Sequence, residues 1–140
     1  MLGQGQLAPA NFASSAVRGS AIWPRPILVA DDSPLIRKML CKLFEAEEDY
    51  DLCAEASNGR EAIDLALKCR PELIILDFSM PVMNGVDAAR ELKKLMPGVP
   101  IILFTQHSET LPRDQLEIYR IVSKSDATEL MQHVRSLLPA

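Results

Sequence analysis

Short apolar runs alternate along the chain with segments whose apolar residues recur every three or four positions. The run Leu73 to Leu76 consists of four large apolar residues, two of them β-branched. Such continuous runs are typical of strands covered on both faces, and those strands belong to parallel sheets flanked by helices. Similar runs at 27–30 and 100–104, and shorter or mixed runs elsewhere, indicate four more strands. The five predicted strands span 27–30, 50–56, 73–76, 100–104 and 121–123.

The segments between these strands have helical spacing. Ser33-Pro34 supplies an N-cap and a first-turn proline, and Asn84 and Asp126 are placed to cap later helices. The pattern therefore predicts five helices, of which the fourth is short. They cover 34–47, 60–69, 86–96, 113–119 and a final stretch from about 126 to 138. Strands alternating with helices predict an α/β protein with a doubly wound parallel sheet and helices on both faces.

Polar residues follow four of the predicted strands. Asp31-Asp32 follows the first strand and Asp77 the third, while Thr105 and Lys124 follow the fourth and fifth. Ligands of open parallel sheets bind beyond the carboxyl ends of the strands, so we expect these groups to converge. Clustered carboxylates raise one another's pKa and usually recruit a cation. Oxygen ligands with few carboxylates favour Mg²⁺.

The order of these groups resembles the receiver domain of bacterial response regulators, of which the chemotaxis regulator is the simplest member. Asp77 is followed by Phe-Ser-Met-Pro-Val-Met-Asn-Gly, and the acid pair, the Thr and the Lys occur in the family's order. The resemblance covers residues 26–138. It implies a flavodoxin-like, five-stranded parallel sheet with strand order 2-1-3-4-5.

The resemblance also implies a role for each group. Asp77 would accept a phosphoryl group from a sensor histidine kinase or a phosphotransfer protein. Asp31, Asp32, Asp77 and the backbone carbonyl of Ser79 would hold Mg²⁺, while Thr105 and Lys124 would bind phosphate oxygens. The protein would then be a signalling switch that catalyses only its own phosphorylation and dephosphorylation, not a turnover enzyme.

An output surface is implied on the fourth helix, the fifth strand and the fifth helix. Two residues depart from the family pattern. Gln106, which follows Thr105, stands where a small residue is usual, and Ile121, in the fifth strand, stands where an aromatic residue is common. The run Lys124-Ser-Asp-Ala resembles receivers that precede a helix-turn-helix domain. We therefore expect either a separate output partner or a DNA-binding domain outside these residues, and the family pattern also allows a phosphorylation-dependent homodimer.

Two other functions fit parts of the pattern. Gln106 and the short fourth helix favour a pseudo-receiver, which would keep the fold and bind partners without phosphate, whereas the intact acid pair, Asp77 and Lys124 oppose it. A phosphatase with an aspartyl nucleophile commonly needs a second acid two residues later for proton transfer. Ser79 occupies that position and cannot serve.

Composition narrows the picture further. The chain has 140 residues, one domain's worth, with a net charge of -4 and no basic run, which argues against direct nucleic-acid contact. No apolar run approaches the roughly 18 residues of a membrane span.

Cys41, Cys53 and Cys69 show no C-x-x-C spacing, and we expect buried, reduced thiols rather than zinc or redox sites. We expect residues 1–25 to be a poorly ordered leader, residues 26–140 to be the receiver domain, and the location to be cytoplasmic.

Overall fold

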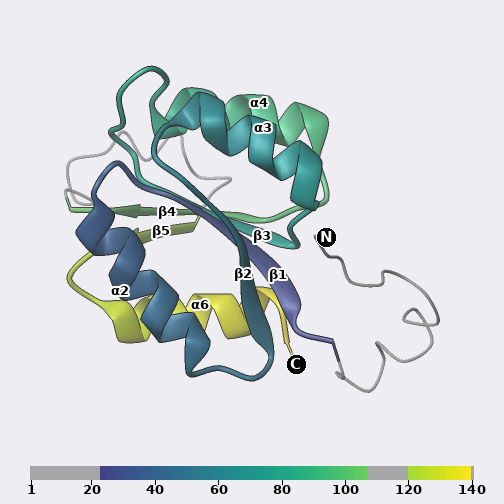
Figure 1. Ribbon diagram of the computed structural model, residues 1–140, viewed down its shortest axis with the longest axis vertical. Coiled ribbons are helices and arrows are strands. Elements are labelled where there is room, and N and C mark those ends of the chain that lie inside the picture. The colour runs from purple at the N-terminus through teal and green to yellow at the C-terminus, as the bar shows by residue number, and fades with distance from the viewer. Residues whose placement is uncertain (1–22, 107–119, 140) are drawn as a thin grey trace, which may run out of the picture.

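The computed structural model describes residues 23–106 and 120–139, which form one parallel sheet with helices on both faces (Figure 1). The strand order is β2-β1-β3-β4-β5, with every neighbouring pair parallel, as the resemblance to receiver domains implies. The strands are β1 (Arg25–Ala30), β2 (Tyr50–Ala56), β3 (Leu73–Leu76), β4 (Ile101–Thr105) and β5 (Arg120–Ser123). The helices are α2 (Pro34–Glu45), α3 (Gly59–Cys69), α4 (Gly85–Leu95) and α6 (Ala127–Leu137).

Two apolar layers enclose the sheet. Successive residues of a strand point to opposite faces, so Leu28 packs with α3 and α4, whereas Ile27 and Val29 pack with α2 and α6. Figure 1 shows α3 and α4 above the sheet and α2 and α6 below it. All four residues of β3 are fully buried, which explains its unbroken apolar run.

Short polar side chains begin each helix. Ser33, Asn58, Asn84 and Asp126 each accept a hydrogen bond from the backbone N–H three residues later, as the sequence predicts for three of them. The helix boundaries lie within two residues of the predicted ones at α2, α3 and α4. The predicted helix over 113–119 lies outside the described residues.

The domain begins slightly earlier than its expected start at residue 26. Arg25 is the first residue of β1, and its backbone N–H donates to the carbonyl of Asp49 over 2.8 Å. Its side chain pairs with Glu72, with 2.7 Å between Nε and Oε1. Arg25 is therefore part of the folded unit. The rest of the expected leader, residues 1–22, lies outside the described residues.

The cysteines differ from expectation. All three are free, but they are half-buried rather than buried. Cys53 in β2 and Cys69 at the end of α3 also lie together, with 2.6 Å between their sulfur atoms. The spacing rule misses this pair because the contact joins a strand to the far end of the following helix.

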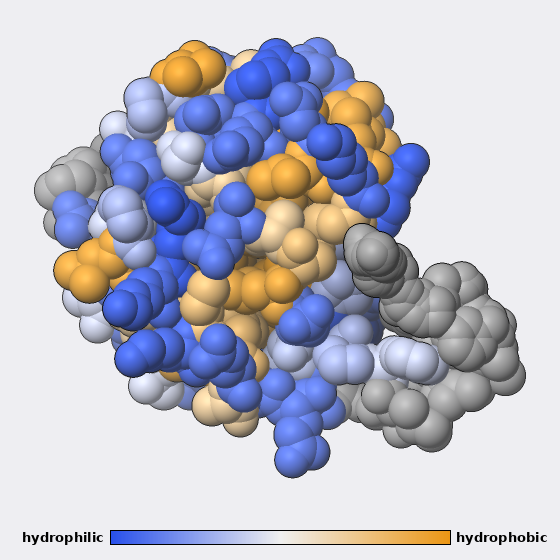
Figure 2. Space-filling model, viewed as in Figure 1, coloured by the Kyte–Doolittle hydropathy of each residue, from blue (hydrophilic) through white to orange (hydrophobic). Residues whose placement is uncertain are grey.

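The surface agrees with a layered α/β protein. In Figure 2 hydrophilic residues cover the helices, and hydrophobic residues gather between the upper and lower helices, over the edge strand β2. Within the described part of the chain, every helix is too short or too polar to cross a membrane.

Candidate functional site

Four strands deliver polar residues to one edge of the sheet. Asp31 and Asp77 follow β1 and β3, Thr105 ends β4, and Lys124 follows β5. The backbone binds these ends together, because the N–H of Asp77 donates to the carbonyl of Ala30 over 2.8 Å and that of Lys124 to the carbonyl of Thr105 over 2.9 Å. Parallel pairing therefore places residues that are far apart in sequence around one cup, as predicted.

Three carboxylates of this cup lie close enough to share a cation. One oxygen from each of Asp31, Asp32 and Asp77 lies within 4.8 Å of the others. Asp31 and Asp77 are buried, whereas Asp32 is exposed at the rim. Oxygen-only ligands with one open side suit Mg²⁺, which keeps several of its waters. We call Asp31, Asp32, Asp77 and Lys124 the acidic cup.

Lys124 neutralises part of this charge. Its Nζ lies 2.7 Å from Oδ2 of Asp31 and 3.3 Å from Oδ2 of Asp77, and only 9% of its side chain is exposed. The other oxygen of Asp31 accepts the N–H of Ser33 over 2.9 Å. A buried charge needs such partners, because an uncompensated one would be strongly destabilising.

Asp77 holds its proton more tightly than an ordinary carboxyl group. Burial, and then the charge of Asp31, raise the pKa of Asp77 to about 6, although Lys124 and the N–H of Ser79 act in the opposite direction. Such a perturbed carboxyl group in a polar cup is typical of a functional site. Near neutral pH the group is mostly ionised and able to act as a nucleophile.

The loop after Asp77 is shaped by its glycine. A Cβ at Gly85 would collide with the backbone carbonyl of Asp77, so only glycine permits this approach. Ser79 is exposed in this loop, and Met80 packs into the core. Val82 adopts a positive φ of 69°, which is strained for a β-branched residue. The motif Met-Pro-x-Met-Asn-Gly thus anchors both ends of a loop beside the cup.

Sequence reasoning missed one residue of the site. Arg37 looks like part of a solvated helix face, but its guanidinium donates to the backbone carbonyl of Asp31 over 2.7 Å. It also lies 3.5 Å from a carboxylate oxygen of Glu55. The signal that could have found it is its position six residues after Asp31, on the first turns of the helix that leaves the site.

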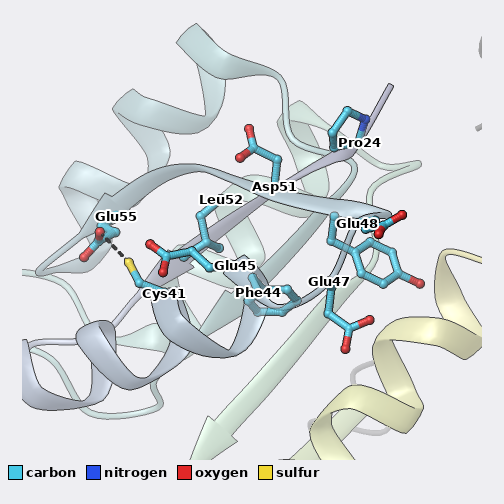
Figure 3. Close-up of a pocket in the computed structure, with 10 residues that line it drawn as sticks. Pro24, Cys41, Phe44, Glu45, Glu47, Glu48, Asp51, Leu52 and Glu55 are labelled. Carbon is cyan, nitrogen blue, oxygen red and sulfur yellow. Dashed lines mark hydrogen bonds between the residues drawn. The ribbon is translucent and has the colours of Figure 1, made fainter. Parts of the chain in front are cut away.

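A second acidic region lies between α2 and the edge strand β2. Figure 3 shows this groove of about 410 Å³, in which Cys41 donates to Glu55. The carboxylates lining it belong to Glu45, Glu47, Glu48, Asp51 and Glu55. Unlike the acidic cup, it has no group of three that lies close enough to hold a metal ion within the described residues.

Comparison with known proteins gives a consistent result. The family model of the response regulator receiver domain matches residues 27–135. The chain is 34% identical to response regulator protein TrrA from Thermotoga maritima, solved in complex with Mg²⁺-BeF, with a TM-score of 0.74 over 81% of this chain and 99% of that one. A chain in the complex of the CheA3 P1 domain with CheY6 from R. sphaeroides is 26% identical, with a TM-score of 0.69 over 84% of this chain and 98% of that one.

Longer proteins contain a similar segment. A protein-glutamate methylesterase/protein-glutamine glutaminase from Hahella chejuensis is 40% identical over 79 residues, which are 56% of this chain and 20% of that protein. The chain therefore spans about a fifth of the length of that relative.

Proposed function

Because the chain belongs to the response regulator receiver domain family, we propose that it is a phosphoacceptor switch of a two-component system, with Asp77 as the acceptor. The observation that supports this most is the convergence of Asp31, Asp32 and Asp77 around Lys124 at the carboxyl edge of the sheet. The donor would be a phosphohistidine of a sensor kinase or of a phosphotransfer protein. The similarity to a chain in the CheA3 P1–CheY6 complex supports a donor of this class.

In the reaction, an ionised oxygen of Asp77 attacks the phosphorus atom and the bond to the donor nitrogen breaks. The product is an aspartyl phosphate, and the donor imidazole takes up a proton. Although the pKa of Asp77 is raised to about 6, most of the carboxyl group is ionised at neutral pH and is available for this attack. The catalysis is limited to this transfer and to the later hydrolysis, so the protein acts as a switch and not as a turnover enzyme.

The donor set fits Mg²⁺. Asp31, Asp32, Asp77 and the backbone carbonyl of Ser79 would hold the ion, which offsets the repulsion between the carboxylate and the phosphoryl oxygens. Asp31 now pairs with Lys124 over 2.7 Å. With Mg²⁺ beside Asp31, Lys124 would be available to bind a phosphate oxygen.

Thr105 and Lys124 complete the proposed phosphate site. Thr105 is buried at the end of β4, and the backbone N–H of Lys124 donates to its carbonyl, so the two donors are neighbours at this edge of the sheet. The Thr105 hydroxyl would donate to a second phosphate oxygen. Fixed donors of this kind stabilise the charge that develops on the phosphoryl group.

We place the output on β5, α6 and the segment between β4 and β5. Thr105 leads into that segment, and β4 pairs with β5 from Ile102 to Thr105. A hydroxyl drawn toward the phosphate would therefore shift elements on this side of the molecule. The molecule that binds this face would be a partner protein, a DNA-binding domain, or a second phosphorylated copy of the chain.

The deciding experiment measures the phosphoryl group directly. The full chain is incubated with Mg²⁺ and acetyl phosphate, and its intact mass is compared with that of Asp77→Asn. We expect the wild type to gain one phosphoryl group, which EDTA prevents. Asp77→Asn should gain none.

A matched control separates the acceptor from general acidity. Asp51→Asn removes an exposed acid in the groove of Figure 3 and should leave the mass gain unchanged. An unmodified wild type, or a phosphoryl group that persists in folded Asp77→Asn, would reject the proposal. In the first case a phosphate-independent binding module becomes the better description.

A further inference from the structure

Two of the three cysteines meet on the α3 side of the sheet, away from the acidic cup. The sulfur atoms of Cys53 and Cys69 lie 2.6 Å apart, closer than ordinary van der Waals contact. A disulfide bond is about 2.05 Å long, so only a small shift separates the two thiols from a bond. Both residues are half-buried, so neither is sealed in the core.

An irregularity in the sheet places Cys53 and its neighbour Ala54 together on the α3 side. Ile27 of β1 pairs with Leu52 of β2, but Leu28 pairs with Ala54, so Cys53 is an extra residue in the edge strand. Such a bulge breaks the normal alternation and redirects a side chain. Cys53 and Ala54 are neighbours, yet both pack against the same apolar layer.

We infer that Cys53 and Cys69 form a reversible oxidation site, at which a small-molecule disulfide such as glutathione disulfide converts the two thiols into one intramolecular disulfide. The bond would tie the bulge of β2 to the last residue of α3.

The order of the two steps follows from the contact between the thiols. The hydrogen bond from Cys53 lowers the pKa of Cys69, whereas the same bond and burial raise the pKa of Cys53. The Cys69 thiolate therefore attacks the oxidant first and expels one glutathione thiolate, which leaves a mixed disulfide. Cys53 then loses its proton, attacks the sulfur of Cys69 and expels the second glutathione. Two protein thiols are oxidised and one glutathione disulfide is reduced to two thiols.

Cys41 provides a matched control. It is also half-buried, but its sulfur donates to Oε2 of Glu55 over 2.9 Å, and burial followed by this hydrogen bond raises its pKa to about 11. Cys41 is therefore a thiol at neutral pH and a poor nucleophile.

The test exposes the native full chain to glutathione disulfide and records the intact mass. We expect a loss of two hydrogen atoms, reversal by dithiothreitol, and a peptide map that joins Cys53 to Cys69. Cys41→Ser should behave in the same way, whereas Cys69→Ser should lose no hydrogen. The closed loop between the two cysteines should raise the melting temperature by about 5–10 °C.

Three results would overturn the inference: three alkylatable thiols after treatment, a stable glutathione adduct in place of the intramolecular disulfide, or a disulfide that includes Cys41. The wild-type measurement alone decides among these results, so it does not depend on whether the serine variants fold. Because the phosphoryl transfer test uses Asp77, its outcome is separate from this one.

Discussion

The acidic cup and the acidic groove show what turns carboxylates into a site. The groove has five carboxylates, more than the cup, but they are spread over the end of α2, the loop that follows it and the edge strand β2 (Figure 3). The cup has three, which come from the ends of β1 and β3 and lie within 4.8 Å of one another. Convergence and burial, rather than the number of acids, distinguish the cup.

The pairing of charges differs in the same way. In the groove, Glu47 pairs with Arg135 over 2.9 Å, and about half of the Arg135 side chain is exposed. In the cup, Lys124 lies between two buried carboxylates. Water screens the first pair and hardly reaches the second, so removing a cation should have unequal effects.

The largest expected effect comes from removing the buried ammonium group. Lys124→Ala leaves Asp31 and Asp77 without their cation, and we expect the free energy of unfolding at pH 7.5 without Mg²⁺ to fall by about 3 kcal/mol. Urea denaturation measures this change. Addition of Mg²⁺ should restore part of the loss, because the ion replaces the missing charge.

Arg135→Ala is the matched change at the groove. Its pair with Glu47 is exposed, and the loss should be below about 1 kcal/mol. Equal losses for the two variants would mean that the cup is as well solvated as the groove, and the contrast between them would disappear.

The second effect concerns the acceptor and depends on pH. The pKa of Asp77 in the folded protein is about 6, above that of an ordinary aspartate, so folding favours its protonated form. The wild type should therefore lose stability as the pH rises from about 4 to 6, and Asp77→Asn should not. Without Mg²⁺ we expect Asp77→Asn to be more stable above pH 6 by about 1–2 kcal/mol, and the difference to vanish near pH 4.

Glu48→Gln is the control for this profile. Glu48 lines the groove and is exposed, so its replacement should change stability by less than about 0.5 kcal/mol across the same range. A similar pH-dependent gain in Glu48→Gln would show that general acidity, rather than the buried cluster, destabilises the protein.

The third effect links the proton of Asp77 to the metal. Mg²⁺ must displace this proton, so its affinity should be nearly constant above pH 6 and fall by about tenfold per pH unit below it. Titration calorimetry measures this dependence. Asp32→Asn should weaken binding, whereas Asp51→Asn in the groove should not. A flat profile through pH 6 would separate Asp77 from the metal site.

The contrast also explains what the sequence could predict. Acids after apolar strands were enough to predict the cup, because parallel pairing brings the ends of β1 and β3 together whatever the details of packing. The short side chains of Ser33 and Asn84 likewise predicted where helices begin. These inferences use only local pattern and the topology of a parallel sheet.

Other features depend on contacts that no local pattern contains. Arg37 reaches the cup only because α2 starts beside the carbonyl of Asp31. Cys53 meets Cys69 only because the end of α3 packs on the side of the sheet that Cys53 faces. Both depend on the relative placement of a helix and a strand, which the spacing of residues does not determine.

The smallest effect tests whether an exposed neighbour of the cup matters. Gln106 follows the buried Thr105 and is itself exposed, in a position where receivers usually have a small residue. The Gln106 side chain should hinder access to the phosphoryl group. We therefore expect Gln106→Ala to shorten the lifetime of the aspartyl phosphate by about threefold, because the activation free energy of hydrolysis falls by less than about 1.4 kcal/mol. The loss of the phosphoryl mass over time measures this lifetime.

Gln132→Ala makes the same substitution at an exposed position of α6 and should leave the lifetime unchanged. An unchanged lifetime in Gln106→Ala would assign control of the reaction to the buried groups alone.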